Sequence, residues 1–474
     1  MTKQEIAAGL REMGLKTGDK VLMHSSLSSL GQVEGGPDAV IDAFLEVLGA
    51  GGTLLVPVFG ALGILTETVK KRPGAVTSSA PVGTLAALGK DAETLLRDHW
   101  KAATAHGEGT PFTRLAEMGG YVCLLGVDQD RNTSLHGIEA LLELPYLGEA
   151  VETFTAPEGE TVTRTYKYYP GPHRNFIGLD RFFREAGVMK TARIGNAQVR
   201  LMKAKEMFRV GLELGKKDPA FALCDNPACA ACVKQRAAIF ADRMARESFR
   251  LAASSRLAGR YVPEMIENLH AAGIRYIELD YLQGRPCAQL PPEKLASAVA
   301  ELSSEDIEIS ALSVNACPDE PEKLVELLKA AGIGRVILPV HSGKAAQLFV
   351  DAGVAVDLRN AACTAKTAAD EVRALEGKVK ACLNPALLVT AGDRAFRSFL
   401  KQRFAGIIGQ ADICDALWDG SLRRLAQGNG EIKELISILR CRNFSGWFCL
   451  GGGVPCPGTL AEMTADFTNL LDNM

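Results

Sequence analysis

The chain has 474 residues, more than a single hydrophobic core usually supports, so we expect two or three domains. Hydrophobic residues make up 47% of the sequence and charged residues 23%, a balance typical of globular proteins and not of disordered ones. The formal net charge of -3 argues against a nucleic-acid binder, because phosphate contacts need a clustered basic surface. No stretch approaches the roughly 18 uninterrupted apolar residues of a membrane span, and the first residues lack the apolar core of a signal peptide. We therefore expect a cytoplasmic protein with neither a nucleic-acid nor a membrane partner.

The first half of the chain alternates between strand and helix patterns. Residues 1–14 have the pattern of an amphipathic helix, with Thr2 and Glu5 as its capping box. Short apolar runs flanked by glycine or charge predict buried strands over 20–24, 52–59 and 121–127. Apolar residues at helical spacing predict helices over 37–49, 82–99, 176–187 and 202–215. The runs VETFTAP and TVTRTYKYYP flank a turn and predict an antiparallel hairpin. We expect a mixed α/β domain over 1–235.

The stretch 233–260 contains no proline and carries seven Lys/Arg against two Asp/Glu, which predicts a basic helical connector. We place the linker at 236–254. Strand candidates then recur, separated by helical segments, over 276–280, 307–314, 335–340, 354–359, 379–384, 406–413 and 446–452. Such alternation implies parallel strands with right-handed crossovers. Seven or eight units in about 220 residues predict a (β/α)₈ barrel of the TIM type over 255–474.

One motif in the first half suggests chemistry. GVDQDRNTSLHGIEALL follows a predicted strand, and its Asn, Thr and Ser can cap a helix that begins near Ser134. His136 then lies in the first turn of this helix, with Glu139 one turn later on the same face. A histidine held by a carboxylate can act as a general base. Taken alone, a His-x-x-Glu pair is more often only a surface contact.

A second motif, HSSLSSLG over 24–31, lies between a predicted strand and a predicted helix. Small hydroxyl residues and backbone N–H groups at such a junction can hold phosphate oxygens. An ordinary serine-rich turn is the alternative. The histidines at 99, 106 and 173 are expected to be solvated loop residues, and His270 to be structural.

Several blocks in matching order make residues 1–235 resemble the aminoglycoside 3-N-acetyltransferase family. They run from GLKTGDKVLMHSSLSSLGQVEGGPDAVIDAFLEVLGAGGTLLVPVF through GILTETVKKRPGAVTSS and VGTLAALG to GTPFTRLAEMGGYVCLLGVDQDRNTSLH and IGNAQVRL. The resemblance implies a mixed α/β acetyltransferase fold and the transfer of acetyl from acetyl-CoA to a small-molecule amine. In the family this amine is the 3-amino group of 2-deoxystreptamine in aminoglycosides, and its acetylation confers antibiotic resistance.

The resemblance also implies roles for single residues. His136 would be the general base, and Glu139, or Asp130 just upstream, would hold its correct tautomer and stabilise the imidazolium. Thr84 would lie near the thioester end of the coenzyme. The residues implied to bind the coenzyme are His24, Ser25, Ser26, Leu27, Ser28 and Thr84. For His24, packing and binding are equally compatible with its place at a strand end.

The acceptor half departs from the family pattern. The family has a longer segment after the VPVF strand that helps to wall the acceptor pocket, whereas here GALGILTE follows almost at once. Where the family commonly has His-Pro-Thr-His-Ser, this chain has Ala80-Pro81-Val82-Gly83-Thr84. An amine other than an aminoglycoside therefore stays open as the acceptor.

The twelve cysteines are expected to be reduced thiols, because the chain shows no export signal. Cys224, Cys229 and Cys232 form a cluster with C-x₄-C-x₂-C spacing. A structural zinc normally takes four ligands, and no fourth cysteine or histidine is adjacent. Asp225, His173 or a distant thiol could complete the set. The sequence therefore favours thiols in a compact turn, with zinc as the alternative.

The second half is similar to the xylose-isomerase-like family of sugar isomerase and epimerase barrels, in strand order and in MIENLHAAGIRYIELD, VELLKAAGIGRVILPV and QGNGEIKELISILRCRNFSGWFCLGG. That family binds a divalent metal with acids and histidines at the carboxyl ends of strands. Several matching positions hold other residues: Arg359, Asn360, Asn384 and Gly451–Gly453. Asp412 and Asp415 remain. We expect a noncatalytic barrel without a divalent metal, retained for binding, assembly or substrate capture.

The leading hypothesis is an acetyl-CoA-dependent amine N-acetyltransferase. One alternative is a bifunctional protein with an active sugar isomerase or epimerase barrel, and another is a noncatalytic binding or scaffold protein. His136 and the HSSLSSLG turn argue against the scaffold, whereas Arg359 and Gly451 argue against the active barrel. A homo-oligomer is compatible with the sequence.

Overall fold

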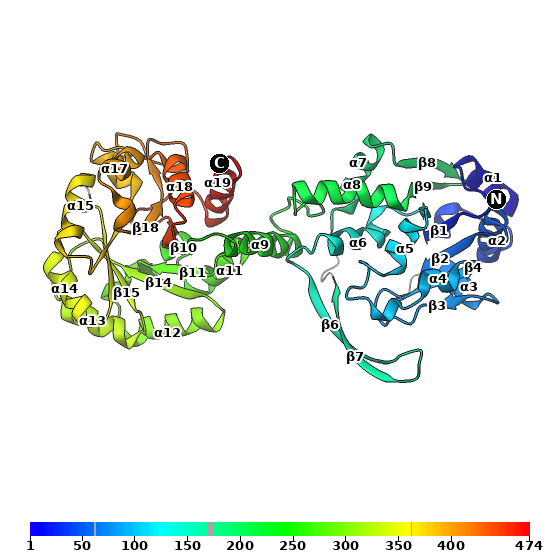
Figure 1. Ribbon diagram of the computed structural model, residues 1–474, viewed down its shortest axis with the longest axis horizontal. Helices are drawn as coiled ribbons and strands as arrows, with labels where there is room; N and C mark the ends of the chain where they lie inside the picture. Colours follow the sequence, from blue (N-terminus) through cyan, green and yellow to red (C-terminus); the bar gives the residue numbers. More distant parts are fainter. Residues whose placement is uncertain (61–62, 169–173, 362) are drawn as a thin grey trace. The chain divides into compact units, whose positions relative to one another are not determined.

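The computed structural model describes residues 1–60, 63–168, 174–361 and 363–474. The chain divides into two compact units, Met1–Gln235 and Arg236–Met474 (Figure 1). Each unit has its own hydrophobic core. Among the described residues, no helix is both long and apolar enough to cross a membrane.

The first unit is built on a mixed seven-stranded sheet with the order β3-β4-β2-β1-β5-β9-β8. Its central strands β2, β1 and β5 are parallel, and the outer pairs are antiparallel. The strands are β1 (Lys20–Ser25), β2 (Thr53–Pro57), β3 (Val76–Thr77), β4 (Leu85–Gly89), β5 (Tyr121–Leu125), β8 (Met189–Ile194) and β9 (Ala197–Lys203).

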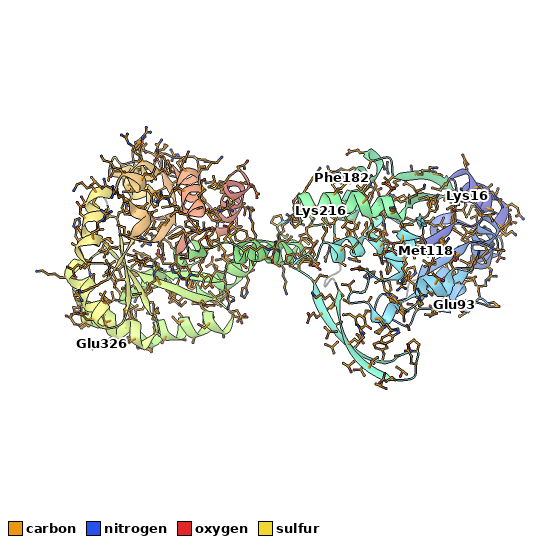
Figure 2. All side chains as sticks on the ribbon, in the orientation of Figure 1. Lys16, Glu93, Met118, Phe182, Lys216 and Glu326 are labelled. Atoms are coloured by element: carbon orange, nitrogen blue, oxygen red, sulfur yellow. The ribbon has the colours of Figure 1, made fainter. Side chains whose placement is uncertain are left out.

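Helices cover both faces of this sheet because successive strand residues point to opposite sides. In β1, Val21 and Met23 pack with α1–α3, whereas Leu22 packs with α4–α8 on the other face. The helices are α1 (Lys3–Glu12), α2 (Gly36–Leu48), α3 (Ile64–Lys71), α4 (Ala92–Leu96), α5 (Pro111–Glu117), α6 (Ser134–Leu141), α7 (Asp180–Glu185), α8 (Ala204–Lys217) and α9 (Ala230–Ala245), of which α9 runs across the boundary between the units. Charged side chains such as those of Lys16, Glu93 and Lys216 are exposed on the outer surface of the unit (Figure 2).

Several local predictions are confirmed. The capping box of α1 is present, with Glu5 accepting from the backbone N–H of Thr2 at 2.7 Å. The expected hairpin forms β6 (Gly148–Thr155) and β7 (Thr161–Tyr168), which extend from the body of the unit (Figure 1). The helix expected over 176–187 begins as a 3-10 turn and continues as α7.

The helix predicted over 82–99 is wrong. Residues 85–89 form strand β4, which pairs antiparallel with β2, and only Ala92–Leu96 are α-helical. The segment LAAL is apolar throughout, so its composition fits a buried strand as well as a helix face. Pairing with β2 decides for the strand because it satisfies the backbone groups of both segments.

Strand register brings the candidate site residues to one edge of the sheet. β1 and β5 are parallel, with His24 opposite Leu124 and Ser25 opposite Leu125. β4 runs antiparallel to β2, so its first residue, Leu85, lies opposite the last residue of β2, Pro57. The turn after β1, the loop after β5 and Thr84 therefore meet at the same edge.

The second unit is a closed barrel of eight parallel strands, as predicted. The strands are β10 (Arg250–Ser254), β11 (Tyr276–Leu279), β14 (Glu308–Ser313), β15 (Arg335–Pro339), β16 (Ala355–Arg359), β17 (Lys380–Leu383), β18 (Ile408–Ile413) and β21 (Trp447–Leu450). The short pairs β12 (Tyr281–Leu282) with β13 (Arg285–Pro286), and β19 (Asp415–Ala416) with β20 (Leu422–Arg423), lie outside the barrel sheet. The helices are α10 (Ser255–Ala258), α11 (Val262–Ala272), α12 (Pro292–Ser304), α13 (Pro321–Ala330), α14 (Gly343–Asp351), α15 (Ala365–Ala374), α16 (Pro385–Thr390), α17 (Ala395–Lys401), α18 (Ile432–Cys441) and α19 (Leu460–Asp472).

The connector predicted over 233–260 is only partly helical. Helix α9 ends at Ala245, and Arg250–Ser254 form the first barrel strand, which the linker at 236–254 had included. β10 pairs with both β11 and β21 and so closes the barrel. Its alanine-rich sequence has no strand signal of its own, and the two neighbouring strands determine its conformation.

Gly126 allows the loop after β5 to pack directly on the turn after β1. Its backbone has φ of 70°, and a Cβ atom at this position would overlap the hydroxyl of Ser29. That hydroxyl in turn donates to the carbonyl of Ser26 at 2.7 Å. Gly126 therefore holds two segments of the candidate site in contact.

We predict that Gly126→Ala destabilises the first unit more than Gly119→Ala. Both glycines have φ of 70°, so both substitutions carry the left-handed strain of about 1–2 kcal/mol. A Cβ at Gly119 meets no atom within 4 Å, whereas at Gly126 overpacking adds about 1–3 kcal/mol. Thermal unfolding followed by circular dichroism would measure the difference. Equal melting temperatures for the two variants would contradict the close packing.

Candidate active site

The centre of the candidate site is a hydrogen bond within helix α6. The helix starts where expected, with the side chain of Asn132 accepting from the backbone N–H of Ser134 at 3.2 Å. His136 and Glu139 then share one face, and His136 Nδ1 lies 2.7 Å from Glu139 Oε2. Since a carboxylate can only accept, a neutral His136 carries its hydrogen on Nδ1 and its lone pair on Nε2.

Glu139 is fully buried and receives two further hydrogen bonds. The hydroxyl of Tyr146 donates to Oε1 at 3.0 Å, and Nε of Arg174 donates to the same oxygen at 2.7 Å. Arg174 is itself 8% exposed, so the two charges form a buried ion pair. A buried carboxylate is stable in its ionised form only when it is paired in this way.

Asp130, the other residue predicted to orient His136, lies elsewhere. It is exposed on the 3-10 turn Gln129–Arg131, and its carboxylate is ion-paired with Arg131 at 3.3 Å. The hydrogen bond at Nδ1 of His136 goes to Glu139 instead. The structure therefore places Glu139, and not Asp130, against Nδ1 of His136.

Of two histidines expected in solvated loops, His99 is buried and His106 is half-buried. His99 is 1% exposed, and its ring nitrogens contact Ser78 Oγ at 3.0 Å and the Ala105 carbonyl at 3.3 Å. Burial lowers the pKa of His99 to about 4. The ring of His106 lies 5.5 Å from the ring of His136, and burial lowers the pKa of His106 well below its ordinary value. His106 is therefore neutral beside the candidate base and does not oppose a positive charge there.

The other two histidines differ in how far the structure describes them. His270 is exposed, and its Nε2 contacts the Glu305 carbonyl at 2.9 Å, which fits a structural role. His173 lies outside the described residues.

The turn after β1 presents small polar groups at the sheet edge. Its backbone begins with the N–H of Ser26 donating to the Leu125 carbonyl at 3.0 Å. The hydroxyls of Ser26 and Ser28 are 3.1 Å apart, and Ser28 is exposed. Ser25 and Leu27 are half-buried. The turn thus places the hydroxyls of Ser26 and Ser28 at this edge, where a ligand could contact them.

His24 and Thr84 flank this turn in different environments. His24 is 4% exposed, and burial lowers its pKa to about 3. A neutral ring can donate or accept a hydrogen bond but cannot neutralise a phosphate. Thr84 is half-buried, and its hydroxyl donates to the Ala80 carbonyl at 2.8 Å.

Comparison with known proteins finds similar proteins for the first half of the chain, which contains the candidate site. A sequence model described as aminoglycoside 3-N-acetyltransferase matches residues 22–61 and 60–214. Aminoglycoside N(3)-acetyltransferase VII of Streptomyces paromomycinus is 31% identical over 264 residues, which cover 45% of this chain and 90% of the relative. The chain belongs to the aminoglycoside 3-N-acetyltransferase family. It is an acyltransferase.

Other similar proteins also cover about half of this chain. Aminoglycoside N(3)-acetyltransferase IV of a Salmonella species is 29% identical and covers 46% of this chain and 88% of the relative. The solved apoenzyme of aminoglycoside acetyltransferase AAC(3)-IVa is 29% identical, covers 50% of this chain and 97% of its own, and has a TM-score of 0.46. AAC-IIIb, solved as a binary complex with CoASH, is 28% identical and covers 46% of this chain and 97% of its own, with a TM-score of 0.42.

The segment that departs from the family pattern packs against Ala105, the residue before His106. Gly83 has φ of 64°, and a Cβ there would lie 2.6 Å from the Ala105 carbonyl. A histidine at position 83, as in the common family pattern, would need a different backbone. The altered segment therefore differs from the family pattern in its backbone at Gly83 as well as in the two absent histidine side chains.

Sequence analysis missed three residues of the site. Tyr146 and Arg174 contact Glu139 from positions 7 and 35 residues along the chain, and His106 approaches from a loop before α5. None of these residues has a periodic or motif signal around it. Tyr146 and Arg174 are needed because Glu139 is a buried carboxylate that must be paired, and the spacing of residues in the sequence does not show which side chains will pair with it.

The barrel interior contains a second polar cluster, centred on Arg359. Its Nε donates to Asp412 at 2.7 Å and its Nη2 donates to Glu278 at 2.7 Å. Gln410 donates to Glu278 at 2.7 Å and to Asp412 at 2.8 Å, and Asn384 donates to Asp412 at 2.9 Å. Burial opposes the charge on Arg359, but Asp412 and Glu278 raise its pKa well above the ordinary value.

Glu278, Asp412 and Cys449 lie close enough together to hold a metal ion. The guanidinium of Arg359 is hydrogen-bonded to both acids, so an ion at this place would meet a fixed positive charge. Two like unit charges about 4 Å apart repel by roughly 4 kcal/mol at an effective dielectric of 20, and a divalent ion doubles this. Asp415 has another role, since it accepts from the backbone N–H groups of Gly428 and Gly430 at 2.9 and 2.8 Å.

We predict that Arg359→Met lowers the free energy of unfolding of the barrel by about 3–5 kcal/mol, because Glu278 and Asp412 would remain buried without their cation. Arg275→Met is the matched control. Arg275 is 64% exposed and paired with Glu308 on the surface, so its loss should change stability by no more than about 1 kcal/mol. Denaturant unfolding of the full chain would measure both values. A small effect at Arg359 would contradict its role as the counter-ion.

Proposed function

We propose that this protein transfers the acetyl group of acetyl-CoA to an amine of an aminoglycoside, with His136 as the general base. The observation that carries the proposal is the 2.7 Å hydrogen bond between His136 and the buried Glu139, at the sheet edge of a family member. Membership in a family of N-acetyltransferases supports acetyl-CoA as the co-substrate. The 3-amino group of 2-deoxystreptamine is the acceptor that the family implies.

The proposed mechanism begins with proton removal. An alkylammonium group has no lone pair and cannot attack a thioester until it loses a proton. Nε2 of neutral His136 accepts this proton, an effect typically worth about 10²–10⁴-fold in rate. The carboxylate of Glu139 stabilises the imidazolium that forms, and Arg174 and Tyr146 keep that carboxylate in place.

We assign the coenzyme to the turn after β1 and to Thr84. The exposed hydroxyl of Ser28 and the half-buried Ser25, Ser26 and Leu27 suit contacts with an elongated, phosphate-bearing ligand. Thr84 directly precedes Leu85, the residue that lies opposite the end of β2, which supports its place near the thioester. His24 is neutral and would contribute a hydrogen bond or packing.

The barrel is proposed to act without catalysis of its own. Arg359 blocks the site where a divalent metal would bind, which argues against the alternative of an active sugar isomerase or epimerase. The first unit, residues 1–235, then carries the acetyltransferase activity, and the barrel over 255–474, together with β10, serves binding, assembly or substrate capture.

The proposal is tested by mixing the full chain with acetyl-CoA and a panel of amines. The panel contains aminoglycosides with a 2-deoxystreptamine ring, matched compounds that lack its 3-amino group, and simple alkylamines. We expect CoA release and a singly acetylated product only where the 3-amino group is present. Acetylation of another amine would show that the proposed acceptor is wrong. The absence of any acetylated product would overturn the proposal.

We predict that His136→Ala lowers turnover at least about a hundredfold and leaves coenzyme binding nearly unchanged, as loss of a general base should. His136→Asn should behave in the same way, because it keeps a polar group but no basic nitrogen. His270→Ala, in the barrel, is the matched control and should keep full activity. Steady-state kinetics and calorimetry with CoA would separate the two effects. An active His136→Ala enzyme at neutral pH would remove this residue from the mechanism.

A further inference from the structure

The three clustered cysteines converge in the folded first unit. The sulfur atoms of Cys224, Cys229 and Cys232 all lie within 4.8 Å of one another. The backbone N–H of Cys224 donates to the sulfur of Cys232 at 3.4 Å. Spacing alone favoured thiols in a turn, but the structure also brings three potential metal ligands to one point.

Local structure explains this convergence. The side-chain oxygen of Asn226 accepts from the backbone N–H of Ala228 at 3.0 Å. The backbone carbonyl of Asn226 accepts from the backbone N–H of Cys229 at 3.0 Å. This turn brings Cys229 back towards Cys224. Helix α9 begins at Ala230, so Cys232 lies about one helical turn beyond Cys229.

We propose that Cys224, Cys229 and Cys232 bind one structural zinc ion. Zinc–thiolate bonds of about 2.3 Å in a tetrahedral site place the sulfur atoms roughly 3.8 Å apart, so the cluster needs only a small contraction. Cys224 and Cys229 are half-buried and Cys232 is buried, which gives the ion both a path of entry and a closed inner side. Asp225, which adjoins Cys224, is the candidate for the fourth ligand.

The contrast with the barrel cluster supports this choice. Glu278, Asp412 and Cys449 also converge, but they are fully buried and Arg359 already compensates both acids. A thiol cluster is neutral when protonated, and it becomes a strong zinc site once it releases its protons to the solvent.

The ion would brace the candidate active site. Ala222, two residues before Cys224, accepts a hydrogen bond from the backbone N–H of Asn175 at 2.8 Å. Asn175 directly follows Arg174, the partner of Glu139. The zinc therefore fixes a segment that holds Arg174 in place, and it takes no part in acetyl transfer itself.

Metal analysis of the full chain tests the proposal. After dialysis without chelator, we expect one zinc per chain. Cys229→Ser should be substoichiometric in zinc, whereas Cys229→His, which keeps a zinc ligand, should retain most of it. Cys317→Ser, an exposed cysteine of the barrel, is the control and should keep one zinc per chain.

Cobalt substitution gives a second readout that does not depend on activity. Cobalt bound at this site should show thiolate-to-metal charge-transfer absorption and the visible bands of tetrahedral coordination, both lost in Cys229→Ser and kept in Cys317→Ser. The proposal is overturned if the zinc-supplemented protein holds no zinc, if Cys229→Ser retains it, or if peptide mapping under non-reducing conditions finds a disulfide within the cluster.

Discussion

The buried carboxylate of Glu139 is the constraint on which the first unit's site depends. An ionised acid in the interior costs several kcal/mol unless charged and hydrogen-bonding partners surround it. Three segments supply these partners: His136 from the same helix, Tyr146 from beyond its end, and Arg174 from a distant segment. The hydrogen bonds to this one carboxylate therefore connect α6 with two loops, and one of them also sets the tautomer of His136.

The parallel strands determine where this arrangement lies. β1, β2 and β5 end at one edge, so the turn that follows β1 and the loop that leads to α6 are neighbours although they are about a hundred residues apart. Gly126 lets them touch. The edge combines hydroxyl groups from one turn with the imidazole of His136 from the helix that follows the other.

The barrel obeys the same electrostatic rule with the signs exchanged. There the central charge is the guanidinium of Arg359, which donates to two buried acids. Gln410 and Asn384 donate further hydrogen bonds to these acids. An arginine supplies positive charge to the two acids without an open coordination position, so both buried carboxylates are neutralised by a side chain of the barrel itself.

Local features were determined by the sequence itself. The capping box of α1, the hairpin, the start of α6 and the His136–Glu139 pair depend on spacings of a few residues, which helix and turn geometry convert directly into contacts. Tertiary structure decided the rest. Residues 85–89 and 250–254 became strands because neighbouring strands pair with them. Arg174 pairs with Glu139, 35 residues away in the sequence, and Arg359 pairs with Glu278, 81 residues away. Only the folded chain brings these buried charges together, so their separation in the sequence does not predict the pairing.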